Sequence, residues 1–426
     1  MNRLVMKSFV GCAVAVLVLG SSACTAPREP VLQARSAQVE QVPVLPAAQA
    51  RPALIAGNTE FALDLYRRLG EGNLFFSPVG ISTAFGMAQA GARGETAREI
   101  AGALRYRLGR DQLHSTLGPL ARELALNEPG RRLAIANALW VQAGYPLLPA
   151  YTQILGTAYG AQAANLDFAR DRPGAAAAIS RWAEQNTNGR IRNLLAADDL
   201  HPLTRLVLTN TVWLKADWQR QFEPRATRER EFFAGGAEPV KVRMMHEREA
   251  RFRHLDGGRF DALELPYQGE EMSMLVFLPK DRAGLPAFER ELDGPRLQQW
   301  TDALRSAERK AVDLALPKIE LRTRYDLPAP LKEMGMRLAY TKEADFSGIS
   351  TAESLLIDRA IHQTFLLVDE KGTEAAAATA ITMRAVSAPP TPEVRFHADH
   401  PFFFVIRDNR SGALLFIGRI ASPAAA

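Results

Sequence analysis

The order of helical and strand-like segments restricts the fold of this chain more than any other feature. Apolar residues follow a helical spacing early in the chain, in segments 58–69, 80–92, 95–108 and 174–187. Strand-like apolar runs dominate later, at 205–218, 260–267, 272–280, 311–321, 401–408 and 412–420. Helices and strands that are segregated along a chain are typical of α+β folds. Because no repeat or linker divides these segments, we expect residues 53–426 to form one α+β domain.

The first 23 residues have the pattern of an export signal. Arg3 and Lys7 precede the apolar run Ser8–Gly20, which is too short for a comfortable membrane span, and small residues follow it. The chain's two cysteines are Cys12, inside this run, and Cys24, directly after the small residues. We therefore interpret residues 1–23 as a signal peptide and exclude a disulfide framework.

Cys24 occupies the position at which a bacterial lipoprotein carries its lipid. The segment Ser21–Cys24 resembles a lipobox, with serine where leucine is usual. This resemblance implies an exported cell-envelope lipoprotein that contacts the membrane only through its lipid. Thr25 in place of aspartate implies the outer membrane if the organism is Gram-negative. Residues 24–52 are rich in Pro, Ala and Gln, which predicts a disordered tether. Simple signal cleavage, giving a secreted or periplasmic protein, is the alternative.

Charge and motifs argue against several function classes. The formal charge is +5, and the signal peptide carries two of the positive residues, so a nucleic-acid partner is not expected. The chain lacks the G-x-S-x-G, H-E-x-x-H, P-loop and dinucleotide-binding motifs. His246 and His254 lie eight residues apart with arginines between them, and His397 and His400 lie in an extended segment where they need not share a face. We therefore predict that the protein is not an enzyme and that it binds no cofactor and no metal.

Eight short motifs then follow one another in a distinctive order. They are "GNLFFSP" (72–78), "AGARGET" (90–96), "LTNTVWLKADW" (208–218), "LPKIELRTRYDL" (316–327), "ADFSGIS" (344–350), "EKGTEAAAATA" (370–380), "HPFFFVIRD" (400–408) and "LLFIGRI" (414–420). Together, across residues 58–423, they resemble the serpin family of protease inhibitors. The resemblance implies a monomer with three β-sheets, about nine helices and an exposed reactive-centre loop.

The family mechanism is also implied by this resemblance. A serine protease attacks the loop and forms a covalent acyl-enzyme, and the cleaved loop then inserts into the central sheet and traps the protease. The segment at which insertion starts, the hinge, comprises Glu370, Lys371, Gly372, Thr373, Glu374, Ala375, Ala376, Ala377, Ala378 and Thr379.

The hinge residues can be tested against this mechanism. In an inserted strand alternate side chains enter the core, and the parity that begins at Thr373 carries no charge, whereas Glu374 and Arg384 share the other parity. Inserting the small side chain of alanine between two strands costs little free energy, and Gly372 is expected to supply backbone freedom. These features favour an inhibitor over the alternative, a non-inhibitory serpin that acts as a binding or carrier protein.

Family spacing places the reactive bond sixteen residues after Glu370, between Val386 and Ser387. A small aliphatic residue before the cut suits elastase-like proteases first, with chymotrypsin-like enzymes also possible targets. If the register shifts so that the cut lies between Arg384 and Ala385, trypsin-like proteases become the expected targets.

Two further clusters are carried over from the resemblance. The breach, where insertion starts, comprises Trp218, Lys318 and Glu370, and the opposite charges of the last two are expected to hold the sheet shut. The shutter, a hydrogen-bonded cluster beneath the opening strands, comprises Ser77, Asn210 and His362. Gly80 stands where the family usually has serine, which is expected to leave the shutter one hydroxyl short.

Overall fold

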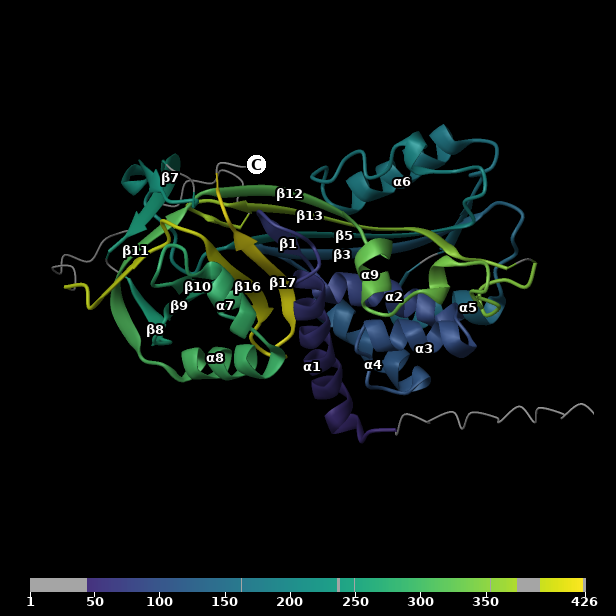
Figure 1. Cartoon of the computed structure of the whole chain (residues 1–426), viewed down its shortest axis with the longest axis horizontal. Helices are drawn as coiled ribbons and strands as arrows, with labels where there is room; N and C mark the ends of the chain where they lie inside the picture. The colour runs from purple at the N-terminus through teal and green to yellow at the C-terminus, as the bar shows by residue number, and fades with distance from the viewer. Residues whose placement is uncertain are drawn as a thin grey trace, which may run out of the picture. The chain divides into compact units, whose positions relative to one another are not determined.

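The computed structural model describes residues 44–161, 163–235, 238–248, 250–352, 354–373 and 391–423. A seven-stranded sheet forms its centre, in the order β12-β13-β14-β5-β3-β2 with β4 beside β3 (Figure 1). Its strands are β2 (Leu126–Glu128), β3 (Arg131–Gln142), β4 (Ala163–Leu166), β5 (Leu206–Asp217), β12 (Ile319–Asp326), β13 (Ile357–Val368) and β14 (Gly372–Thr373).

The two middle strands of this sheet pair in two different ways. Over residues 357–365 and 206–213, β13 and β5 pair directly in parallel. At the other end the short β14 lies between them and is antiparallel to both. The sheet therefore begins to open at one end only.

The remaining strands form a ten-stranded sheet in the order β1-β17-β16-β10-β9-β8-β11-β7-β6, with β15 beside β11. They are β1 (Leu74–Phe76), β6 (Arg228–Phe232), β7 (Val240–Glu247), β8 (Arg251–Asp256), β9 (Phe260–Pro266), β10 (Met272–Pro279), β11 (Arg309–Pro317), β15 (Val394–His397), β16 (Phe402–Asp408) and β17 (Leu414–Ile420). Every residue of β10 and β16 is buried, which explains their mostly apolar sequences. Two of the three expected sheets are thus joined, because β11 pairs with β8 at its start and with β7 and β15 further on.

Nine α-helices occur among the described residues, as expected. They are α1 (Ala47–Tyr66), α2 (Pro78–Gly91), α3 (Gly94–Ala103), α4 (Arg110–Leu124), α5 (Pro149–Ile154), α6 (Arg172–Asn186), α7 (Leu285–Glu291), α8 (Gly294–Ser306) and α9 (Pro328–Glu333). Figure 1 shows α2 to α4 on one face of the central sheet and α6 on the other. Every residue of α2 is buried, and its N-terminus is capped by Ser77, whose Oγ accepts from Gly80 N–H at 3.2 Å. The α+β prediction is confirmed.

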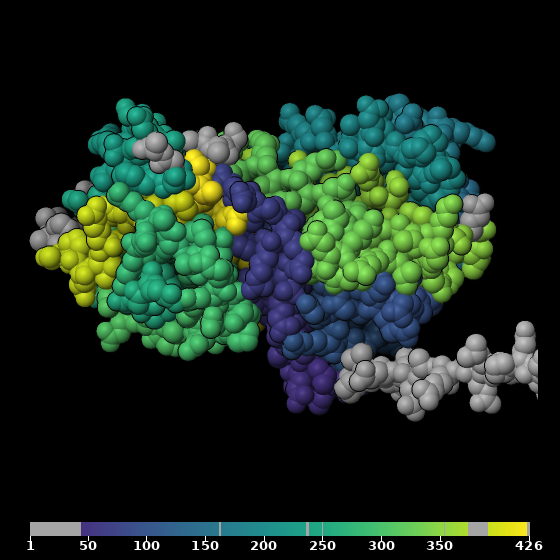
Figure 2. Space-filling model, viewed as in Figure 1, coloured from purple at the N-terminus to yellow at the C-terminus, as the bar shows by residue number. Residues whose placement is uncertain are grey.

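The first helix begins earlier than its apolar pattern indicated. Expected from Asn58, α1 begins at Ala47, so residues 47–52 of the predicted tether are helical. Buried Ala50 and Leu54 anchor this extension, and Gln112 exchanges two hydrogen bonds with the Leu45 backbone. In Figure 2, α1, in purple, lies along the surface between the region of α7 and α8 and that of α3 and α4.

The export signal and Cys24 lie outside the described residues, so both stay predictions from the sequence. Within the described part of the chain, no helix combines the length and apolarity that a membrane span requires.

Candidate functional site

The open end of the central sheet brings four hinge residues into the structure. Gly372 pairs with Asp217 of β5, and Thr373 pairs with both Ala216 of β5 and Val368 of β13. The rest of the hinge, Glu374 to Thr379, and the candidate reactive-bond residues Arg384, Ala385, Val386 and Ser387 lie outside the described residues. The chain is described again from residue 391 and enters β15 at Val394.

Gly372 is needed for a different reason from the one expected. A Cβ atom at this position would lie 2.1 Å from the Ala216 carbonyl oxygen, and its φ is not in the left-handed region. Glycine therefore permits a close approach of β14 to β5, and the expectation of special backbone freedom was wrong.

Thr373 places its side chain in the core. The side chain has no exposed surface, and its hydroxyl lies 2.7 Å from the hydroxyl of Tyr267. The Tyr267 ring stacks on Trp218, with centroids 4.6 Å apart. Trp218 in turn donates from Nε1 to the Asp369 carbonyl at 3.0 Å and from its backbone to the Lys371 carbonyl at 2.7 Å. The start of the hinge is thus held from both its backbone and its side chains.

The predicted breach residues come together at the same point. Lys318 lies between β11 and β12 and donates from Nζ to Glu370 Oε2 at 2.7 Å. Thr227, which the sequence did not reveal, donates to the other oxygen, Oε1, at 2.8 Å. Burial raises the pKa of the Glu370 carboxyl, but the hydrogen bonds from Lys318 and Thr227 outweigh it and hold the pKa below its usual value.

The predicted shutter residues also meet, beneath the direct β5–β13 pairing. Strand register aligns Asn137, Asn210, His362 and Tyr325 in one row across β3, β5, β13 and β12. His362 donates from Nδ1 to Asn210 Oδ1 at 2.5 Å, and its Nε2 accepts from the backbone N–H of Ser77 at 3.0 Å. The Asn210 amide donates to Asn137 Oδ1 at 2.6 Å. One neutral tautomer of His362 satisfies both partners, so the row links the sheet to the start of α2.

Gly80 does not leave a gap in this cluster. A Cβ atom there would lie 2.6 Å from a Val212 methyl group and 2.8 Å from Asn210 Oδ1. The Asn210 side chain therefore occupies the space that a serine would need, so the cluster lacks the serine hydroxyl but contains no empty space at this position.

The structure also assembles a group that sequence spacing did not reveal. His246 of β7 and His397 of β15 both pair with Ala315 of β11, and Asp313 lies two residues earlier on the same face. In the sequence, His246 lies near His254 and His397 lies near His400, so spacing alone suggested those two pairs and not the pair His246 and His397. The sequence predicted no metal site, and these three residues bring ligand atoms within 4.8 Å of one another.

Comparisons with known proteins agree with this geometry. The family described as "Serpin (serine protease inhibitor)" matches residues 56–423. An uncharacterized serpin-like protein of Thermococcus kodakarensis is 40% identical over 89% of this chain and 88% of its own. Leukocyte elastase inhibitor of Sus scrofa is 38% identical over 87% of this chain and 99% of its own. The crystal structure of uncleaved ovalbumin superimposes with a TM-score of 0.80 at 29% identity, covering 87% of this chain and all of ovalbumin.

The buried His362 generates a prediction about pH. Burial lowers its pKa from 6.5 to about 3, so between these values the unfolded chain binds a proton that the folded chain does not. Its contribution to stability is complete above the unfolded pKa and is lost as pH falls, by at most about 1.4 kcal/mol per pH unit. In His362→Gln, which cannot titrate, the thermal-denaturation midpoint at a fixed scan rate should fall less between pH 7 and pH 5 than in the wild type. Equal falls in the two proteins would contradict a neutral His362.

Proposed function

This chain belongs to the serpin family, which is described as a family of serine protease inhibitors and not of enzymes, and from that premise we propose that it traps serine proteases irreversibly by loop insertion. The observation that carries this proposal is the position of β14. Thr373 already pairs with both β13 and β5, and Gly372 pairs with β5, while further along these two strands pair with each other.

A strand that continued β14 would have to replace the direct pairing. In register, it would next separate β13 from β5 at the pair Phe365 and Trp213. The exchange costs little backbone hydrogen bonding, because an inserted strand pairs with both neighbours. The insertion site therefore needs the two strands to part and the side-chain bond between His362 and Asn210 to be exchanged.

The side chain of Thr373 supports the parity that we predicted for the hinge. Thr373 is fully buried, so residues at even spacing from it would also enter the core. These residues are Ala375, Ala377, Thr379, Ile381 and Met383, none of them charged. Glu374 and Arg384 would point to the opposite face, where solvent can reach them.

The chemistry of trapping belongs to the protease. Its serine oxygen bonds to the Val386 carbonyl carbon, the Val386–Ser387 peptide bond breaks, and Ser387 leaves as a free amine. Val386 stays esterified to the protease while the cleaved loop inserts. Water must hydrolyse that ester to release the enzyme, and insertion that distorts the protease before this step makes the inhibition irreversible.

We propose an elastase-like primary target. Val386 is small and aliphatic, which suits a shallow apolar specificity pocket. Similar proteins from Sus scrofa, Bos taurus, Equus caballus and Homo sapiens bear the name leukocyte elastase inhibitor. A trypsin-like target follows instead if the cut lies after Arg384.

We further propose that the inhibitor is exported and anchored to the cell envelope through lipid on Cys24. The basis is the signal-like segment 1–23 and the lipobox-like residues before Cys24. A tether up to the start of α1 at Ala47 would let the inhibitor reach proteases near the membrane.

Complex formation tests the inhibitor proposal. Mixed with pancreatic elastase, the wild type should give a one-to-one complex that survives boiling in detergent. Thr373→Arg places a charge where Thr373 is fully buried, so insertion should stall and the yield of complex should fall by about tenfold or more, with the chain cut as a substrate. Thr373→Ser keeps the hydroxyl beside Tyr267 and should retain the complex. A wild type that is only cleaved would identify a non-inhibitory serpin.

Mass spectrometry of the peptide released on trapping tests the reactive bond. With elastase, the carboxyl-terminal peptide should begin at Ser387. A peptide that begins at Ala385, together with stable complexes formed only with trypsin, would move the reactive bond to Arg384 and replace the elastase proposal.

Substitution of Cys24 tests the anchor. Expressed with its signal peptide in a bacterium, the wild type should fractionate with membranes and carry acyl mass on its amino-terminal peptide. Cys24→Ser should appear in the soluble exported fraction with its inhibitory activity unchanged. An unmodified wild type in the soluble exported fraction would indicate simple secretion.

A further inference from the structure

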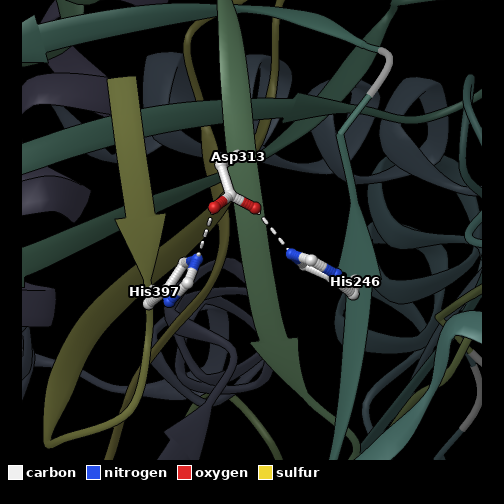
Figure 3. A group of neighbouring side chains, drawn as sticks. All are labelled: His246, Asp313 and His397. Carbon is white, nitrogen blue, oxygen red and sulfur yellow. Dashed lines mark hydrogen bonds and ion pairs between the residues drawn. The ribbon is translucent and has the colours of Figure 1, made fainter. Parts of the chain in front are cut away.

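The side chains of His246, Asp313 and His397 converge from the three strands β7, β11 and β15. Figure 3 shows the Asp313 carboxylate between the two imidazole rings, one of its oxygens directed to each. His246 Nε2 lies 2.6 Å from Oδ1, and His397 Nε2 lies 3.2 Å from Oδ2. All three side chains are mostly buried, with 13 to 16% of their surface exposed, so solvent reaches the group from one side.

We propose that His246, Asp313 and His397 form a binding site for a divalent transition metal, with Zn²⁺ the best match. Two imidazole nitrogens and one carboxylate oxygen are a common zinc ligand set, and three protein ligands leave a fourth position for water. In a tetrahedral zinc site neighbouring ligand atoms lie roughly 3.3 Å apart. The two histidines contact different oxygens of Asp313, so the carboxylate must turn slightly for one oxygen to share a metal with both imidazole nitrogens.

His397 is the residue that most points to a ligand. Its Nε2 is buried and makes no hydrogen bond, although it lies at ion-pair distance from Asp313. Buried polar atoms are normally satisfied, and a metal bound to Nε2 after its proton has moved to Nδ1 would supply the missing partner.

Two arginines set the conditions for binding. Arg248 donates from Nε to Asp313 Oδ1 at 3.2 Å, and Arg395 donates from Nε to His397 Nδ1 at 3.1 Å. A metal on Nε2 requires the proton of His397 to move to Nδ1, so the Arg395 hydrogen bond must break when the metal binds. Arg395 is exposed, so its side chain can turn into solvent at little cost.

The consequence of binding follows from the strands involved. β15 is the first strand after the loop, and it pairs only with β11 among the described strands. A metal shared by His397, Asp313 and His246 would link β15 to β11 and β7. It would therefore hold the carboxyl-terminal attachment of the loop in place, independently of whether a protease is ever trapped.

Titration with Zn²⁺ tests this site. The full mature chain, without a histidine tag and treated with chelator, should bind one Zn²⁺ saturably at neutral pH by calorimetry, and its denaturation midpoint should rise. His397→Gln and Asp313→Asn should each weaken binding by about tenfold or more and abolish the rise. Arg395→Ala should bind more tightly than the wild type, since no guanidinium competes for His397.

A matched control is available elsewhere in the chain. His254 and Asp261 form a similar pair, 2.8 Å apart, outside the His246–Asp313–His397 group. His254→Gln should bind Zn²⁺ like the wild type. Circular dichroism will confirm that each variant is folded. Replacement of zinc by Co²⁺ should give the visible absorption of a tetrahedral site in the wild type, which tests the site without any variant.

Two results would overturn the proposal. One is the absence of saturable Zn²⁺ binding by the wild type, and the other is binding that His397→Gln and Asp313→Asn leave unchanged. Because the assay contains no protease, its failure would leave the inhibitor proposal intact, and a chain that fails to trap elastase can still bind the metal.

Discussion

The parallel pairing of β5 with β13 is the interaction on which the rest of the molecule depends. While it holds, residues 206–213 and 357–365 close the central sheet. Where it stops, β14 enters between the two strands with the first residues of the hinge. The sheet is thus complete along most of its length and open at one end, so a strand supplied from the loop has a defined place to start.

The polar groups along this opening are paired in the closed sheet, and the His362–Asn210 bond is the one that crosses from β13 to β5 and must be exchanged when the strands part. Buried polar groups are costly when unpaired, which would make an opening sheet unstable if its core were held by isolated contacts. At the closed part, His362 connects Asn210 of the neighbouring strand to the backbone of Ser77 before α2. At the open end, Lys318 and Thr227 each bind one oxygen of Glu370. The charge of Glu370 is therefore satisfied outside the slot into which the hinge would move.

The two ends of the loop are attached by different physical means. Its amino-terminal side is held by the buried Thr373, the stacked Tyr267 and Trp218, and backbone hydrogen bonds to residues 369–371. Its carboxyl-terminal side is held by a four-residue strand and by the ion pairs around Asp313. Apolar packing at the first attachment favours a fixed starting point for insertion, whereas ionic contacts at the second can be altered by a bound cation.

Local periodicity and propensity in the sequence indicated the fold class, four of the helices and six strand-like segments, and the family resemblance supplied the expected number of helices. The sequence also indicated the parity of the hinge and, by family resemblance, the residues of the breach and shutter. Tertiary structure decided the rest. Three side-chain pairs join residues that are far apart in the chain: Thr227 with Glu370, Tyr267 with Thr373, and Asn137 with Asn210. Strand register depends on both partner strands, so it cannot be predicted from either one alone. For the same reason only the folded sheet showed that Gly372 is required by a close backbone contact, and that His397 belongs with His246 and Asp313.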